Sequence, residues 1–164
     1  FAEAEKAIQD KIDRLMAIKG ERSVDSIHKE LGLVMWDFVG MGRTAEGLKE
    51  GIAKIDAIKK EFWSNVYIPG EADKLNNELE KALRLADFIE IGRLMAVDAL
   101  HREESCGGHF REEFQTPEGE AMRQDDKFSY VGCWKYTGED SEPELIKEPL
   151  DYEFTERKTR NYKN

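Results

Sequence analysis

The residues best suited to chemistry lie together between His101 and Phe114, in the stretch HREESCGGHFREEF. Cys106 and His109 have the Cys-x-x-His spacing of zinc ligands. His101 and Cys133 could complete a set of four ligands, although Cys133 comes from a separate predicted strand. A metal site at Cys106, His109 and Cys133 is therefore one hypothesis, but the chain lacks the second closely spaced pair that would make the motif specific.

Two other interpretations of this stretch remain open. Cys106 could be a nucleophile activated by a nearby histidine, although the sequence supplies no orienting partner and no oxyanion pocket. Alternatively, Glu103-Glu104-Ser105 ends a helix, and Gly107-Gly108 permits backbone angles or close approaches that other residues resist. On the residues alone, no catalytic constellation is present.

The composition excludes several classes of function. The chain has 164 residues and a net charge of −10, which opposes binding to a phosphate backbone. No apolar run approaches the ~20 residues of a membrane span, and no signal peptide opens the sequence. Two cysteines do not make a disulfide framework, so we expect a reducing, cytoplasmic setting.

Helical spacing of apolar residues predicts four helices before residue 106. The first runs from Phe1 to Gly20 without a capping residue, so we expect the sequence to be a fragment that has lost an N-terminal part. The second follows Ser23 and ends at Gly40. The third follows Thr44 in the GMGRT turn, and the fourth spans about 73–104 after the Pro-Gly turn at 69–70.

The second half of the fourth helix is apolar around most of its circumference. We expect this half to be covered by its own bundle on one side and by another body on the other. Trp36, Trp63 and Trp134 are interpreted as core aromatics rather than as a stacking site. His28 is interpreted as a surface residue.

After Phe114 the sequence becomes polar and rich in turn-forming residues, with no pattern of core residues. KFSYVGCWKY, residues 127–136, alternates and is rich in aromatic and β-branched residues, which predicts a strand. Residues 145–154 could return as a second strand, followed by a basic tail. The sequence predicts a mainly α protein: an antiparallel bundle of three to four helices (1–106), the last one long, followed by a small β-hairpin and an extended tail (107–164).

The stretch at residues 101–114 resembles a segment of the flavoprotein subunit of succinate dehydrogenase and fumarate reductase. That segment commonly reads Arg-x-Glu-Ser-Arg-Gly-Ala-His followed by Arg-Glu-Asp-Phe. The matching residues are Glu104, Ser105, Gly107, His109, Arg111 and Glu112. Residues 39–55 and 123–136 are also similar to this family, as is the closing segment with Arg160 and Tyr162. Cys106 stands where the family usually has Arg, and Gly108 where it has Ala or Leu, which fits a divergent branch such as a Bacteroidetes-like one.

The resemblance implies a parent enzyme that interconverts succinate and fumarate by hydride transfer to covalently attached FAD. Electrons would pass to an iron–sulfur subunit and on to a membrane quinone-reactive subunit, so the chain would be cytoplasmic and peripheral to the inner membrane. The FAD and substrate sites would lie upstream, with none in these 164 residues. The chain would scaffold its own FAD-binding domain, with Glu104, Ser105, Gly107, Gly108, His109 and Arg111 as domain-interface candidates.

Two rival functions remain at this level. The L-aspartate oxidases share the helical region and the same motif, so one of them could be the parent. A free-standing helical interaction module is the alternative from a different class of protein.

Overall fold

The computed structural model describes residues 1–138 and 141–158 of the chain. The chain forms two compact units, a helical unit of residues 1–101 and a C-terminal unit that begins at Arg102. The expected boundary at residue 106 lies five residues further along.

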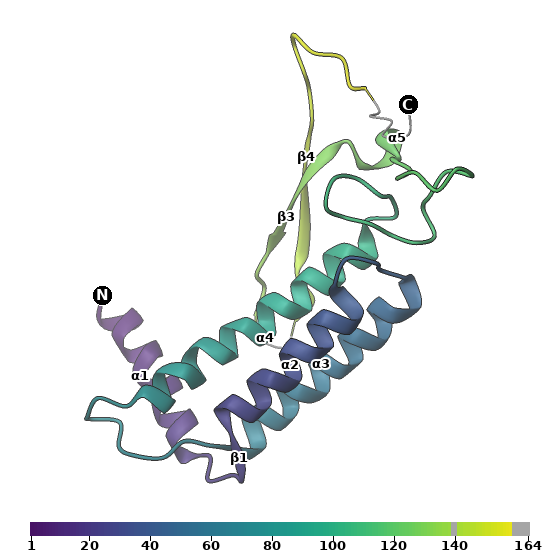
Figure 1. Ribbon diagram of the computed structural model, residues 1–164. Coiled ribbons are helices and arrows are strands. Elements are labelled where there is room, and N and C mark those ends of the chain that lie inside the picture. The colour runs from purple at the N-terminus through teal and green to yellow at the C-terminus, as the bar shows by residue number, and fades with distance from the viewer. Residues whose placement is uncertain (139–140, 159–164) are drawn as a thin grey trace. The chain divides into compact units, whose positions relative to one another are not determined.

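The helical unit is a bundle of four helices, α1 (Ala2–Ala17), α2 (Val24–Val39), α3 (Ala45–Asn65) and α4 (Asn77–His101). Helices α2, α3 and α4 lie side by side, and α1 lies at the end of the bundle where α4 begins (Figure 1). The predicted mainly α class, with a long last helix, is confirmed.

Local capping explains where the helices begin. The Ser23 hydroxyl accepts a hydrogen bond from the Ser26 amide at 3.2 Å, and the Thr44 hydroxyl accepts one from the Gly47 amide at 3.0 Å. Both starts were predicted. Helix α4 begins at Asn77 and not near residue 73, because the side-chain oxygen of Asn76 accepts from two backbone amides, those of Glu78 and Leu79, at 3.1 and 3.0 Å.

The ends of two helices differ from the prediction. Helix α1 stops at Ala17, since Ile18 is already extended, and α4 stops at His101 instead of Glu104. Beyond α1, the Gly20 amide donates to the Val66 carbonyl at 3.2 Å. Two short strands, β1 (Arg22–Ser23) and β2 (Val66–Tyr67), then pair in parallel, a contact that the sequence did not predict.

One hydrophobic core fills the helical unit. Its members include Leu15, Ile27, Leu48, Ile55, Phe62, Leu85 and Ile89, each at most 1% exposed. Helix α1 contributes a single fully buried residue, Leu15. The bundle is therefore held mainly by α2, α3 and α4.

The second half of α4 is only partly covered by this core. Ile89 and Ala96 are buried, whereas Phe88, Ile91 and Met95 are 43%, 54% and 51% exposed. Trp36 on α2 is 80% exposed, so its interpretation as a core aromatic is wrong. His28 is exposed, as predicted.

The C-terminal unit contains a short helix, α5 (Asp125–Phe128), and an antiparallel hairpin of β3 (Tyr130–Lys135) and β4 (Glu144–Pro149). Tyr130 pairs with Pro149 and Lys135 with Glu144. The predicted hairpin is confirmed, but its first strand begins three residues late because α5 occupies part of the expected strand. Arg160 and Tyr162 lie outside the described residues.

Candidate functional site

The Cys-Gly-Gly-His segment forms a tight two-residue turn. The Cys106 amide donates to the His109 carbonyl at 2.9 Å, and the His109 amide donates back to the Cys106 carbonyl at 3.1 Å. Gly107 has φ +59°, a left-handed angle that glycine adopts at low cost. A Cβ on Gly107 or Gly108 would meet no atom within 4 Å, so Gly107 is needed for its conformation and not for lack of space.

Ser105 closes the loop that follows this turn. Its hydroxyl accepts a hydrogen bond from the Arg111 amide at 2.9 Å and donates to the Arg111 carbonyl at 3.1 Å. The Ser105 amide donates to the Met122 carbonyl at 2.9 Å. Because Ser105 is fully buried and Arg111 is 2% exposed, this pair of bonds holds the loop from within.

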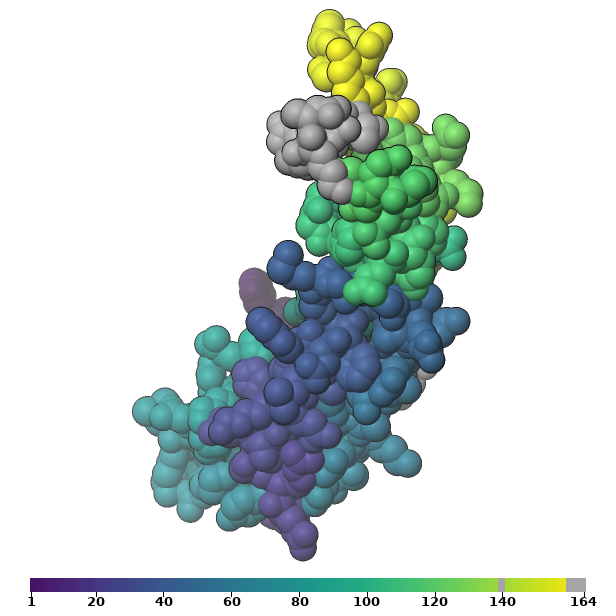
Figure 2. All heavy atoms as spheres, turned by 45° about the vertical axis from the view of Figure 1, so that its right-hand side comes forward, coloured from purple at the N-terminus to yellow at the C-terminus, as the bar shows by residue number. Residues whose placement is uncertain are grey.

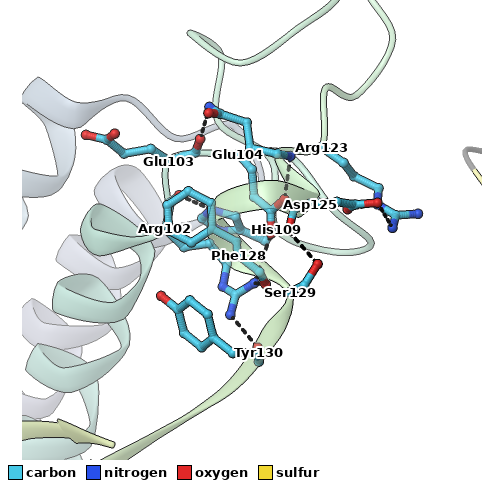
Figure 3. Close-up of polar contacts among 10 residues, drawn as sticks. Arg102, Glu103, Glu104, His109, Arg123, Asp125, Phe128, Ser129 and Tyr130 are labelled. Carbon is cyan, nitrogen blue, oxygen red and sulfur yellow. Dashed lines mark hydrogen bonds and ion pairs between the residues drawn. The ribbon is translucent and has the colours of Figure 1, made fainter. Parts of the chain in front are cut away.

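Glu104 links the start of the unit to a distant segment (Figure 3). Its carboxylate accepts from the Arg102 guanidinium at 2.9 Å and from the Gln124 amide at 2.8 Å. Arg102 also donates to the carbonyls of Phe128 and Tyr130, at 3.3 and 3.2 Å. The guanidinium carbon lies 5.6 and 5.2 Å from the centroids of those two aromatic rings.

His109 is fixed by the same network. Its Nε2 lies 2.8 Å from the Arg102 carbonyl oxygen. A carbonyl can only accept, so Nε2 carries the proton and donates it. The ring of His109 therefore braces the turn against the residue that begins the unit.

Arg123 and Asp125 form a two-pronged ion pair beside this network. Arg123 Nε donates to Asp125 Oδ1 at 2.9 Å, and Nη2 donates to Oδ2 at 2.7 Å. These hydrogen bonds to the Asp125 carboxylate are the largest cause that raises the pKa of the Arg123 guanidinium above its ordinary value, with burial acting in the opposite direction. A third nitrogen, Nη1, donates to the Lys158 carbonyl at 3.1 Å and ties the chain after β4 to this pair.

The arrangement is suited to holding a shape rather than to reacting. Glu104, Ser105 and Arg111 are buried and engaged with partners inside this unit. Cys106, Gly107 and Gly108 are exposed at the turn, and Glu112 is exposed in the loop that follows it. The interface role predicted for the whole motif would therefore be carried by this turn, with the buried residues fixing its position.

The residues predicted as possible metal ligands are placed as follows. Cys106 and Cys133 are exposed free thiols, Cys106 in the turn and Cys133 in β3. Across the residues that the structure describes, no three His, Cys, Asp or Glu side chains are grouped so that they could hold a metal ion.

Sequence reasoning missed Arg102, Gln124 and the Arg123–Asp125 pair as members of the network. Glu104 and Gln124 are 20 residues apart, so their contact has no local signal. The Arg-x-Asp spacing of Arg123 and Asp125 is visible in the sequence, but nothing there predicts that the two side chains form an ion pair.

Comparison with known proteins identifies the family. Residues 28–162 match the family model described as the fumarate reductase flavoprotein C-terminal region. An uncharacterized FAD-dependent oxidoreductase of Methanocaldococcus jannaschii is 32% identical over 112 residues, 68% of this chain and 20% of that protein. The fumarate reductase flavoprotein subunit of Proteus vulgaris is 31% identical over 104 residues, 63% of this chain and 17% of that protein. L-Aspartate oxidases match over a shorter stretch of 84 residues.

Solved structures agree on the fold. A quinol–fumarate reductase structure with menaquinol molecules matches 94% of this chain and 26% of its own, with a TM-score of 0.78 and 24% identity. The chain thus spans about a fifth of the length of the curated relatives it matches. It belongs to the family formed by the C-terminal region of the fumarate reductase and succinate dehydrogenase flavoproteins.

Proposed function

We propose that this chain is the C-terminal helical domain of a flavoprotein that interconverts succinate and fumarate, and that it acts there as a scaffold for the FAD-binding domain. The observation that carries the proposal is the family match over residues 28–162, together with relatives named as fumarate reductase flavoprotein subunits. The FAD of that flavoprotein would take up and release the hydride.

The chain's own residues do not fit FAD. A dinucleotide is usually held where a parallel strand leads through a glycine-rich turn into a helix N-terminus. The parallel strands found in the described part of the chain, β1 and β2, have two residues each. The contribution of this chain would therefore be to position and stabilise the FAD-binding domain.

Within the flavoprotein, the C-terminal unit would present the Cys106–His109 turn at a fixed angle. The two hydrogen bonds between Ser105 and Arg111, and the hydrogen bond from the Gln124 amide to the Glu104 carboxylate, resist displacement of this turn. The proposed partners are the FAD-binding domain of the same polypeptide, an iron–sulfur subunit and a membrane quinone-reactive subunit. Among the described residues, no helix is long and apolar enough to cross a membrane. We propose that the flavoprotein attaches to the inner membrane through those partners.

Turnover by the complete flavoprotein tests the reaction. Fumarate reduction with an artificial electron donor, and succinate oxidation with an artificial acceptor, are compared with oxidation of L-aspartate. Succinate and fumarate turnover without aspartate turnover is the expected result. Preferential oxidation of aspartate would assign the chain to an L-aspartate oxidase, the runner-up that the 84-residue matches favour. A coding sequence with no flavin domain before Phe1 would instead favour the free-standing module.

A further inference from the structure

Helices α2 and α4 leave apolar side chains exposed along adjoining sides. Phe88, Ile91 and Met95 are three and four residues apart on α4, so they form one row on its surface. Gly32 and Trp36 are four residues apart and form a row on α2. We name these five residues the α2–α4 face.

The two rows border each other. His28, one helical turn before Gly32, stacks on Phe88 with ring centroids 5.6 Å apart. Met35 directly precedes Trp36, and Gly92 directly follows Ile91. The Met35 sulfur lies 3.1 Å from the position that a Cβ on Gly92 would take. The Lys81 ammonium lies 3.2 Å from the Asp25 carboxylate, which is a further contact between the same two helices.

The exposure of this face is unusual for a surface that stays in water. Trp36 is 80% exposed, and the three apolar residues of α4 are 43–54% exposed. Contiguous apolar surface that is rimmed by charged residues marks an interaction site in soluble proteins. Figure 2 shows part of α2, in dark blue, uncovered on the surface of the bundle.

Gly32 points to close contact with another body. Glycine in the middle of a helix costs about 1 kcal/mol relative to alanine. A Cβ at Gly32 would meet no atom within 4 Å, so nothing in the described chain requires a glycine there. A glycine is required where another body must approach the helix backbone closely.

The occupant that fits is the remainder of the same polypeptide. Relatives of this chain extend over about five times its length, so a large body of the same protein is available to cover the face. A second copy fits less well, because each copy carries a net charge of −10 and two copies repel each other.

We propose that the α2–α4 face is the surface on which the preceding part of the flavoprotein packs, a docking surface that rests on the proposed function. The body that covers it presents apolar side chains to Trp36, Ile91 and Met95, and approaches the α2 backbone most closely at Gly32.

Thiol labelling tests this surface in the 164-residue chain and in the complete flavoprotein. Both exposed cysteines are first replaced, by Cys106→Ser and Cys133→Ser. One new cysteine is then introduced by Met95→Cys, or by Ala57→Cys as the matched control. Ala57 is also apolar and exposed, but it lies on α3, which contributes no residue to the α2–α4 face. The rate of reaction with a water-soluble maleimide is measured for each variant.

In the flavoprotein, Met95→Cys should react at least ~10-fold more slowly than in the 164-residue chain, because a covered thiol reacts only when its region opens. Ala57→Cys should change less than about 2-fold. Equal rates at position 95 in the two proteins, or equal protection at both positions, would overturn the proposal. Protection at position 95 in the short chain that weakens on dilution would also overturn it and indicate a second copy. Turnover of succinate and fumarate is assayed on the same flavoprotein. Protection at position 95 without this turnover would refute the proposed reaction but would still support the docking surface.

Discussion

At the scale of single residues, the motif between Glu104 and Arg111 acts through hydrogen bonds to backbone. Glu104 and Ser105 use their side chains to hold Gln124 and Arg111, and Arg102 holds the carbonyls of Phe128 and Tyr130. The buried members of this motif thus hold the shape of the loop.

The double hydrogen bond of Ser105 should be costly to remove. Ser105→Ala leaves the buried amide and carbonyl of Arg111 without this partner, and we expect a loss of about 1–3 kcal/mol in the stability of the C-terminal unit. Amide hydrogen exchange at Arg111, measured in increasing urea, reports this loss. Ser64→Ala is the control, since that hydroxyl is exposed and bonds only within its own helix. Unchanged exchange at Arg111 would refute the closing role of Ser105.

The turn offers a matched pair of glycines. Gly107→Ala places a side chain at φ +59° and should cost about 1–2 kcal/mol, whereas Gly108→Ala has free space and an ordinary φ and should stay within about 0.5 kcal/mol. Urea unfolding followed by the fluorescence of Trp134 compares the two variants. Equal effects would mean that the turn does not depend on the left-handed angle at residue 107.

The contribution of the Arg123–Asp125 ion pair to stability should be the same at pH 7 and at pH 9. A cation whose pKa is raised on folding contributes stability that is present below its unfolded pKa and lost only when the pH rises through the folded value. For arginine both values lie far above pH 9. Asp125→Asn should therefore lower stability by the same small amount, about 0.5 kcal/mol for a partly exposed pair, at pH 7 and at pH 9. Urea midpoints at the two pH values check this, and an effect that disappears by pH 9 would contradict it.

At the scale of helices and strands, the structure shows which features a sequence can specify. The starts of α2 and α3 were predictable because Ser23 and Thr44 each bond an amide three residues away. The start of α4 was not, since Asp73, Asn76 and Asn77 are all competent caps and only Asn76 makes the bonds. The β1–β2 pair joins residues 44 apart through backbone alone, and the exposure of Trp36 depends on which side of α2 its neighbours cover.

The connection between α1 and the bundle depends on Gly20. A Cβ there would lie 2.0 Å from the Asn65 carbonyl oxygen, so Gly20→Ala should force β1 and β2 apart and cost about 1–3 kcal/mol or more. Gly32→Ala is the contrasting variant, in an open helical position, and should gain about 0.5–1 kcal/mol. Thermal unfolding of the 164-residue chain, followed by helical circular dichroism, measures both. A destabilising Gly32→Ala in this chain would contradict the open environment assigned to α2.

At the scale of the whole molecule, the chain combines a core of its own with an apolar face that this core does not use. The buried core explains why the helical bundle could be predicted from periodicity, and the alternating burial along β3 explains why the hairpin could be predicted from alternation. The apolar residues of α4 predict that another body covers it, but the residues of that body could not be predicted, since one sequence does not contain the surface that meets Trp36, Phe88, Ile91 and Met95. Both features fit a part of a larger flavoprotein.

The most direct measurement is the flavin content of the purified 164-residue chain after incubation with FAD and gel filtration, beside the complete flavoprotein treated in the same way. Visible flavin absorbance should co-elute with the complete protein and not with the chain. Flavin bound to the chain in equal molar amount would contradict it, because the scaffold would then carry the redox cofactor itself.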